Sequence, residues 1–467
     1  SAVQENGEII LLGGDEGLVS VTGTLDASGK EAGQTGGEVQ VLGEWVALME
    51  NAFIDVSGDL GGGTALIGGD YQGNGIVPNS EKTYFHSTAF VTADALSSGD
   101  GGKVILWADD ATYFYGSISG LGGLQSGDGG FVEVSGKKFL DFDGNVDVSS
   151  AHGEGGTLLL DPLSITLLAT TPSPAPDGFS TSDLAELFGD DPGESSIFDP
   201  RASGTFSGVA AGTTIILQAT DFITVDADFN LQTATGNTGV SLIMQAGNNI
   251  NINQSITLDN GGTLHIEADS LHTALGGNGT GTITLNTGKS LTTSNGTVTL
   301  SALNFAIDGS ISTGNANVII GQSVDGAALT LGFTGAMLTD AELDNITTTG
   351  TIIIGQATTA GLNGVGGGTQ LTTGAITLDE LTLGAKNITL IGSTIADDDD
   401  VGSSTTTTGT LTLTSTAEIG NTAMGAEGLN IDVGTLAITG TGSSNVTLTH
   451  EGTTNTNLTF GDTVVGG

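Results

Sequence analysis

The chain of 467 residues has no cysteine and very few basic residues. Without cysteine it can form neither a disulfide framework nor a thiolate metal site. Only 8 Lys and Arg residues stand against 53 Asp and Glu residues, which gives a formal net charge of −45. A chain this acidic repels phosphate backbones and anionic lipid headgroups, so the composition excludes nucleic acids and membrane surfaces as partners. Two explanations of the negative charge remain. It could bind cations, calcium above all, or it could serve only to keep the chain soluble.

Proline, aromatic residues and long apolar runs are also scarce. No run of 18 apolar residues occurs, so we expect no membrane-spanning helix. Residues 1–5 lack the basic start and apolar core of a signal peptide, so an exported protein would be a processed or trimmed form. With 78 glycines, much threonine and only 7 prolines, the composition is typical of many short strands joined by tight turns.

The abundant feature is a repeated Gly-Gly motif. Each copy opens with two glycines, continues as a short alternating strand and leads to a further strand. The first strand residues of successive copies are 30, 26, 39, 28 and 26 residues apart, and they are Glu8, Glu38, Thr64, Lys103, Phe131 and Thr157. This is a period near 27 with one insertion. Self-similarity at this period predicts a solenoid, in which each rung buries its apolar side chains against the next.

Within each copy, the pattern of apolar residues indicates strands rather than helices. Val39 and Val41 alternate with Glu38 and Gln40, which is the period-2 pattern of a half-buried strand. Two or three such strands in 27 residues can close one coil. We therefore predict an all-β fold, a right-handed parallel β-helix (β-solenoid) with short helical excursions.

The repeat divides the chain into three regions. They are regular rungs over 1–168, a proline-rich excursion with a short helix over 169–211, and looser rungs over 212–467. Ser182 and Gly189 are suited to cap the helix in the excursion. A Thr-x-x-Glu capping box at Thr339 predicts a second short helix.

Residues 69–90 are the insertion in the regular period. They contain aromatic residues, a proline and a lysine, so we expect a loop that protrudes from one rung. Solenoids carry binding residues on such loops, which makes Tyr71, Tyr84, Phe85 and His86 candidate binding residues. An insertion that is merely tolerated is the alternative.

An acidic residue recurs in the turn before three of the Gly-Gly pairs. Asp100, Asp128 and Glu154 are 28 and 26 residues apart, so an offset of one rung would stack their carboxylates on one corner. Stacked like charges repel each other unless a cation or water screens them. Calcium is one interpretation of this corner, and solvated turn residues are the other. We expect no other cofactor.

Catalytic patterns are weak, so we predict that the protein is not an enzyme. A polysaccharide lyase needs a basic residue beside a uronate, and a hydrolase needs a pair of carboxylates. The only arginine, Arg201, falls in the proline-rich excursion, and Asp147 with His152 matches a hydrolase only in residue type. We interpret His265 and His272 as surface residues, with a metal site as the alternative.

Several segments together resemble one known family. They are GGTLLLDPLSITL (155–167), TIILQATDFITV (214–225), LIMQAGNNINI (242–252), LTDAELDNITTTGTIIIG (338–355) and TSTAEIGNTAMG (414–425). The sequences of these segments and their order along the chain are similar to those of filamentous-haemagglutinin-type exoproteins of two-partner secretion. The resemblance implies a right-handed β-helix, export through an outer-membrane transporter, and an adhesive role on or outside a Gram-negative-type bacterium. The family's amino-terminal secretion domain is not recognisable, so the chain resembles part of the adhesin shaft.

These inferences lead us to expect a secreted or cell-surface structural and adhesive solenoid. It would associate with further copies of itself end to end into a filament, because no amphipathic cap is visible and bare rungs would present unpaired backbone groups. A monomeric adhesin shaft that presents the 69–90 loop to a glycan or host surface is the alternative, and a polysaccharide-degrading enzyme is a third possibility. The expected partners are the chain itself, the transporter and surface glycans, with no embedding in a membrane.

Overall fold

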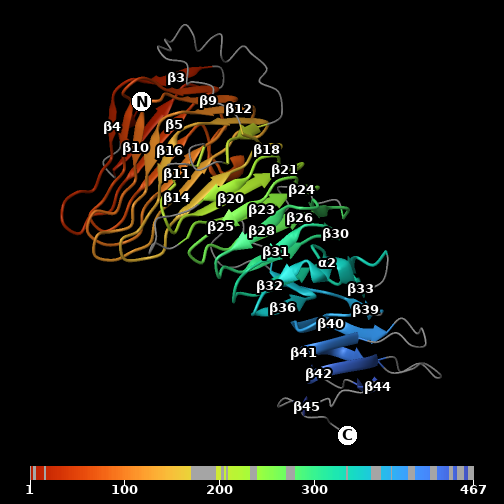
Figure 1. Cartoon of the computed structure of the whole chain (residues 1–467). Coiled ribbons are helices and arrows are strands. Elements are labelled where there is room, and N and C mark those ends of the chain that lie inside the picture. Colours follow the sequence, from red (N-terminus) through yellow and green to blue (C-terminus); the bar gives the residue numbers. More distant parts are fainter. Residues whose placement is uncertain are drawn as a thin grey trace. The chain divides into compact units, whose positions relative to one another are not determined.

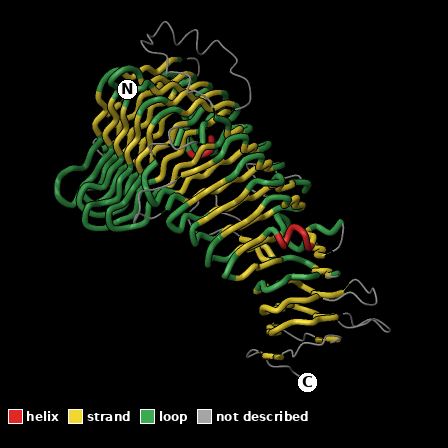
Figure 2. The backbone as a smooth tube through the Cα atoms, viewed as in Figure 1, coloured by secondary structure: helices red, strands yellow, loops and turns green. Residues whose placement is uncertain are grey.

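The computed structural model forms two compact units, Ser1–Met244 and Gln245–Gly467. It describes residues 2–3, 7–14, 17–169, 196–200, 205–206, 209–231, 239–269, 279–332, 335–358, 370–379, 381–397, 405–420, 429–440, 445–446, 448–449 and 457–460. Both units consist mostly of short strands, and most of these pair in parallel from one rung to the next (Figures 1 and 2). The prediction of an all-β parallel β-helix is therefore confirmed. Among the described residues, no helix is long and apolar enough to cross a membrane.

The regular rungs of the first unit each place one strand in each of three sheets. The first sheet contains β2 (Glu8–Leu12), β5 (Glu38–Leu42), β8 (Thr64–Ile67), β11 (Lys103–Leu106), β14 (Phe131–Val134), β17 (Thr157–Leu160), β20 (Thr214–Ala219) and β23 (Ser241–Ala246). The second contains β3 (Leu18–Val21), β6 (Trp45–Leu48), β9 (Lys82–Phe85), β12 (Ala111–Phe114) and β15 (Phe139–Phe142). The third contains β4 (Thr24–Asp26), β7 (Phe53–Asp55), β10 (Phe90–Thr92), β13 (Ser117–Ser119) and β16 (Asn145–Asp147).

The register of the first sheet reproduces the period in the sequence. The six positions that open the repeats pair in series, and the pairs are Glu8 with Glu38, Glu38 with Thr64, Thr64 with Lys103, Lys103 with Phe131, and Phe131 with Thr157. The insertion between Thr64 and Lys103 therefore leaves the strand pairing unchanged. The spacing alone predicted this register correctly.

The Gly-Gly pairs lie where successive rungs touch. A Cβ atom on Gly62 would collide with the carbonyl oxygen of Ala93, and one on Gly63 would collide with that of Gly37. The colliding atoms belong to the backbone, so no change of rotamer would relieve the contact. The repeat thus keeps glycine where the backbones of stacked rungs touch, and the Gly63 amide also closes its own turn by donating to the Val56 carbonyl (2.7 Å).

Apolar side chains from all three sheets fill the coil. Val39, Val46 and Ile54 of one rung are completely buried. Inside the second sheet, Phe114 lies 5.0 Å from Phe85 and 5.0 Å from Phe142 between ring centroids, so an aromatic stack follows the rungs.

The proline-rich excursion returns to the coil as a strand. β19 (Ser196–Phe198) pairs in parallel with β18 (Ile165–Leu167), and the Leu140 amide of β15 donates to Ser196 Oγ (2.8 Å). Part of the predicted excursion therefore belongs to the sheets. The helix predicted from Ser182 lies outside the described residues. The rung continues through β21 (Ile223–Val225) and β22 (Phe229–Leu231).

The outer edge of β2 was expected to present unpaired backbone groups, but part of it is paired. β1 (Ala2–Val3) pairs antiparallel with β2, with Ala2 opposite Ile10 and Val3 opposite Ile9. Part of the outer edge of β2 is therefore already hydrogen-bonded within the chain, and this part cannot accept another strand.

The second unit repeats the parallel arrangement with less regular lengths. Its strands are β24 (Ile250–Ile252), β25 (Ile256–Leu258), β26 (Leu264–Ala268), β27 (Thr282–Leu285), β28 (Ser290–Thr293), β29 (Val298–Ser301), β30 (Asn304–Ile307), β31 (Ser310–Ser312), β32 (Val318–Gly321), β33 (Leu329–Gly332), β34 (Leu338–Thr339), β35 (Ile346–Thr347), β36 (Thr351–Ile354), β37 (Gln356–Thr358), β38 (Gln370–Thr372), β39 (Ala375–Leu378), β40 (Asn387–Asp397), β41 (Thr405–Ile419), β42 (Leu429–Gly440), β43 (Asn445–Val446), β44 (Leu448–Thr449) and β45 (Asn457–Phe460). The helix predicted at Thr339 is α2 (Asp340–Asp344), and both halves of its capping box form. That prediction is confirmed.

Candidate functional site

The three predicted acidic residues stack on one corner of the first unit. The Asp128 amide donates to Asp100 Oδ1 (2.8 Å), and the Glu154 amide donates to Asp128 Oδ1 (2.8 Å). All three residues are exposed to solvent. Figure 2 shows the turns of this unit as a stack of loops. The prediction that these residues share a corner is confirmed.

The stacking also shows what these carboxylates do in the fold. The carboxylates of Asp100 and Asp128 each accept an amide of the following rung, so they replace backbone acceptors at the turn. Within the part of the chain that the structure describes, no group of three or more His, Asp or Glu side chains is placed to hold one metal ion. Calcium on this corner stays a prediction.

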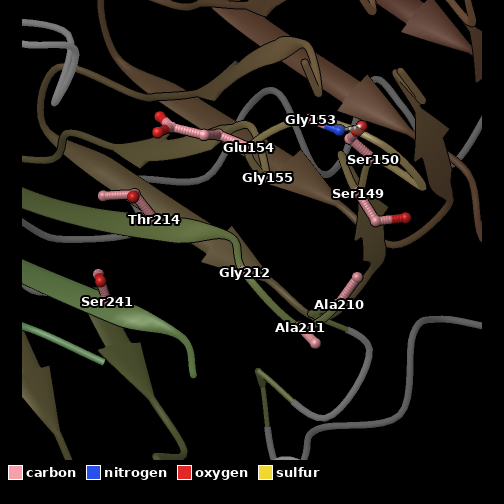
Figure 3. A pocket seen from close by; sticks show the side chains of 10 residues that line it. All are labelled: Ser149, Ser150, Gly153, Glu154, Gly155, Ala210, Ala211, Gly212, Thr214 and Ser241. Carbon is pink, nitrogen blue, oxygen red and sulfur yellow. Dashed lines mark hydrogen bonds between the residues drawn. The ribbon is translucent and has the colours of Figure 1, made fainter. Parts of the chain in front are cut away.

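An open groove of about 700 Å³ lies where this stack of turns ends. Its residues come from the turn that carries Glu154, from the residues just before β20, and from the first residues of β20 and β23; they are Ser149, Ser150, Gly153, Glu154, Gly155, Ala210, Ala211, Gly212, Thr214 and Ser241 (Figure 3). Ser150 Oγ accepts the Gly153 amide (2.7 Å) and donates to the Gly127 carbonyl (2.6 Å), which fixes the turn. The groove is therefore built on a rigid hydrogen-bonded turn.

The lining of the groove is polar and nearly free of charge. It combines one carboxylate, on Glu154, with hydroxyl groups and glycine backbone. Such groups donate to and accept from the hydroxyls of a neutral ligand. Glycoside hydrolysis by the usual mechanism needs two carboxyl groups across the scissile bond, and this lining supplies one.

The predicted binding loop over 69–90 is wrong in its second half. β9 begins at Lys82, and Tyr84, Phe85 and His86 are only 1%, 0% and 6% exposed. Phe85 belongs to the aromatic stack and Tyr84 packs on Tyr115 (6.0 Å between ring centroids), because these residues continue the second sheet. They cannot contact a partner in this fold. One signal was available, since Thr-Tyr-Phe occurs at 83–85 and again at 112–114.

The true insertion is residues 69–79, which we call the cover segment. Its two ends meet where the Ser80 amide donates to the Gly68 carbonyl (2.6 Å). The segment includes the short 3-10 helix η1 (Tyr71–Gly73) and lies on the outer face of the first sheet. Tyr71 packs edge-on against Phe131, with 5.8 Å between ring centroids. The fourth candidate, Tyr71, is therefore half-buried against the sheet.

Two carboxyl groups are buried beneath the cover segment. Glu133, on β14, is 0% exposed, and Asp161, directly after β17, is 8% exposed. The Gln72 amide donates to both carboxylate oxygens of Glu133 (3.1 and 3.2 Å). The Gln72 side-chain amide donates to Gln218 Oε1 (2.7 Å) and to Asp161 Oδ2 (3.4 Å). One residue of the insertion thus joins three strands of the sheet.

Burial governs the ionisation of this pair. Loss of solvation raises the pKa of Asp161 to about 7, against the opposing effect of its hydrogen bond with Gln72. Loss of solvation also raises the pKa of Glu133 well above its ordinary value, and the charge of Asp161 adds to the effect. Although the pair has the composition of a hydrolase site, the cover segment separates it from solvent.

Of the two histidine candidates, the structure describes His265. His265, on β26, is largely buried, and its Nε2 atom lies 3.9 Å from Glu267 Oε2. The His265 side chain is only 15% exposed, so the interpretation as a surface residue is wrong. Burial lowers the pKa of His265 to about 4. His272 lies outside the described residues.

The Asp147 and His152 pair is not joined either. Asp147 Oδ1 accepts the Ser149 amide (3.0 Å), while the His152 amide donates to Ser150 Oγ (3.2 Å). Among the described residues, no hydrogen bond or ion pair links the side chains of Asp147 and His152. The residues therefore act as turn residues.

Comparison with known proteins gives no further assignment. No protein-family model matches the chain, and no curated protein matches it significantly.

Proposed function

We propose that this protein is a secreted or cell-surface β-solenoid that acts as an adhesive scaffold. The observation that supports this best is the groove beside Glu154, because it is open to solvent and offers hydrogen-bonding groups without a second carboxylate. The buried pair, Glu133 and Asp161, lies under the cover segment, where a polymeric substrate has no access. Both features favour binding over catalysis.

Carbohydrate is the ligand class that fits the groove. Hydroxyl and amide groups recognise sugar hydroxyls through hydrogen bonds, and one carboxylate strengthens such a bond. The net charge of −45 disfavours sialylated and uronate-containing glycans. We therefore expect binding of neutral or amino-sugar glycans. Export through an outer-membrane transporter and association of copies into filaments remain predictions, and electron microscopy at rising protein concentration tests the second.

Glycan binding to variants of the groove tests the proposal. A hydrogen bond to a charged group contributes about 1.5–3 kcal/mol, so Glu154→Ala should weaken glycan binding about tenfold or more. Thr214→Val, which removes a hydroxyl of the lining, should weaken it less. The matched control is Glu31→Ala, which removes an exposed acid outside the groove and should leave affinity unchanged. Equal affinity for all three variants, or binding of anionic glycans only, would contradict the proposal.

A further inference from the structure

The cover segment hides an apolar patch on the outer face of the first sheet. Leu66, Ile105 and Trp107 form this patch, and Tyr71 and Val77 of the cover segment pack against it. Gly73 lies so close to the indole ring of Trp107 that a Cβ atom would come within 2.7 Å of it. The same positions on a strand without such a cover would face solvent, since side chains alternate between the core and the outside.

Polar contacts to buried groups hold this cover in place. Gln72 has a left-handed backbone (φ 50°), which aims its amide at Glu133 and its side chain at Asp161 and Gln218. At the edge, Asp70 pairs with Lys103 (3.4 Å), whose ammonium lies 5.7 Å from the centre of the Tyr71 ring. The central contacts of the cover thus depend on two carboxyl groups.

Neither of these carboxyl groups has a cation beside it in the described residues. Lys103 is the nearest basic side chain that acts on Glu133, and it forms its ion pair with Asp70. The other ionisable groups that face the cover segment are Tyr71 itself and Asp109, which accepts hydrogen bonds from Asn79 Nδ2 (3.2 Å) and Trp107 Nε1 (3.1 Å). Ionisation of both buried acids would therefore place two negative charges together, opposed by the Gln72 N–H donors and by the charge of Lys103 but with no ion pair to either acid in the described residues.

We propose that the cover segment is a pH-controlled latch that stays closed while Glu133 and Asp161 are protonated and opens as they ionise. Opening releases the Gln72 contacts, lets water reach both carboxylates and exposes the patch around Trp107. The latch is local, because the strands beneath pair with their neighbouring rungs and need no contact with the cover segment.

The direction of the pH effect follows from burial. An acid whose pKa is higher in the closed form than in the open form binds more protons when closed, so rising pH favours opening. For Asp161 the window extends from about 4, the ordinary carboxyl pKa, to about 7 in the closed form. Across that window each carboxyl raises the opening constant by up to about tenfold per pH unit. Glu133 shifts in the same direction.

Hydrogen exchange of the wild-type protein at pH 5 and pH 8 tests the latch. After correction for the intrinsic rate, the opening constant of peptides over 69–79 should rise at least about tenfold, while peptides over 103–106 should stay unchanged. Acrylamide quenching of Trp107 in a Trp45→Phe background should increase over the same range, since Trp45 is the other tryptophan. An unchanged opening constant in the wild-type protein would overturn the proposal.

Variants identify the groups responsible. The double variant Glu133→Gln with Asp161→Asn keeps the shape of both side chains and removes their charge. In this variant the opening constant of 69–79 should rise less than about twofold between pH 5 and pH 8. Asp161→Asn alone should reduce this rise in the opening constant partly, and this single variant replaces the double variant if the double variant does not fold. Glu50→Gln removes an exposed acid and should behave as wild type. A pH response that persists undiminished in folded Asp161→Asn and in the folded double variant would also overturn the proposal.

Discussion

At the scale of single residues, glycine decides how closely the rungs approach. Gly62 and Gly63 each face backbone carbonyl oxygens of neighbouring rungs, on opposite sides. This explains why the motif needs two consecutive glycines rather than one. The pair is a packing requirement, so its recurrence marks the rungs better than any apolar residue does.

Replacement of one of these glycines should destabilise the first unit. In Gly63→Ala the new methyl group collides with the Gly37 carbonyl, and overpacking of this kind costs about 1–3 kcal/mol. The matched control is Gly23→Ala, because nothing lies within 4 Å of a Cβ atom there, and it should change stability by less than about 0.5 kcal/mol. Urea denaturation of both variants measures the difference. Equal midpoints would contradict this account of the repeat.

Residues also show where sequence reasoning was insufficient. Glu133 lies between Val132 and Val134, so alternation correctly predicts that it points out of the coil. Alternation cannot predict that the cover segment lies on top of it, because Gln72 is 61 residues away in sequence. Burial of an outward position depends on where an insertion folds, and no periodic pattern records that.

At the scale of elements, the capping box at Thr339 predicts its helix correctly, whereas the bounds of the 69–90 insertion are predicted poorly. The capping box at Thr339 was sufficient to locate α2, since its hydrogen bonds are local. The predicted end of the 69–90 loop is wrong because Phe85, within it, belongs to β9 and packs on Phe114 in the aromatic stack of the second sheet. The partners of the cover segment lie 61, 89 and 146 residues away in sequence.

Helix α2 gives a test at this scale. Glu342 Oε2 accepts the Thr339 amide (2.8 Å), and its Oε1 accepts the Ile307 amide of β30 (2.9 Å), so it joins the helix cap to a strand. Glu342→Ala should therefore cost about 2–4 kcal/mol, more than the roughly 1 kcal/mol expected for Thr339→Ala.

The control for this test lies on the same helix. Asp344→Ala removes only an exposed pair with Lys386 (2.9 Å) and should cost less than about 1 kcal/mol. Thermal denaturation of the three variants gives the order of stabilities. If Thr339→Ala were the most damaging, the helix would be held by its cap alone and not by the strand.

At the scale of the whole molecule, the period predicted the fold class, the pairing register and the shared acidic corner. It did not predict the groove, because the groove lies where the stack of turns ends, beside Ala210, Ala211 and Gly212. It also did not predict β19, which returns to the sheet after a long excursion. These features arise where the repeat is interrupted, so they depend on three-dimensional contacts that the period does not contain.

We expect this protein to bind carbohydrate through its surface without transforming it. The sharpest test is mass spectrometry of a neutral and amino-sugar oligosaccharide mixture after incubation with the wild-type protein. Some oligosaccharides should be retained on the protein and recovered with unchanged mass. Shortened or otherwise altered products, or no retention of any oligosaccharide, would contradict it.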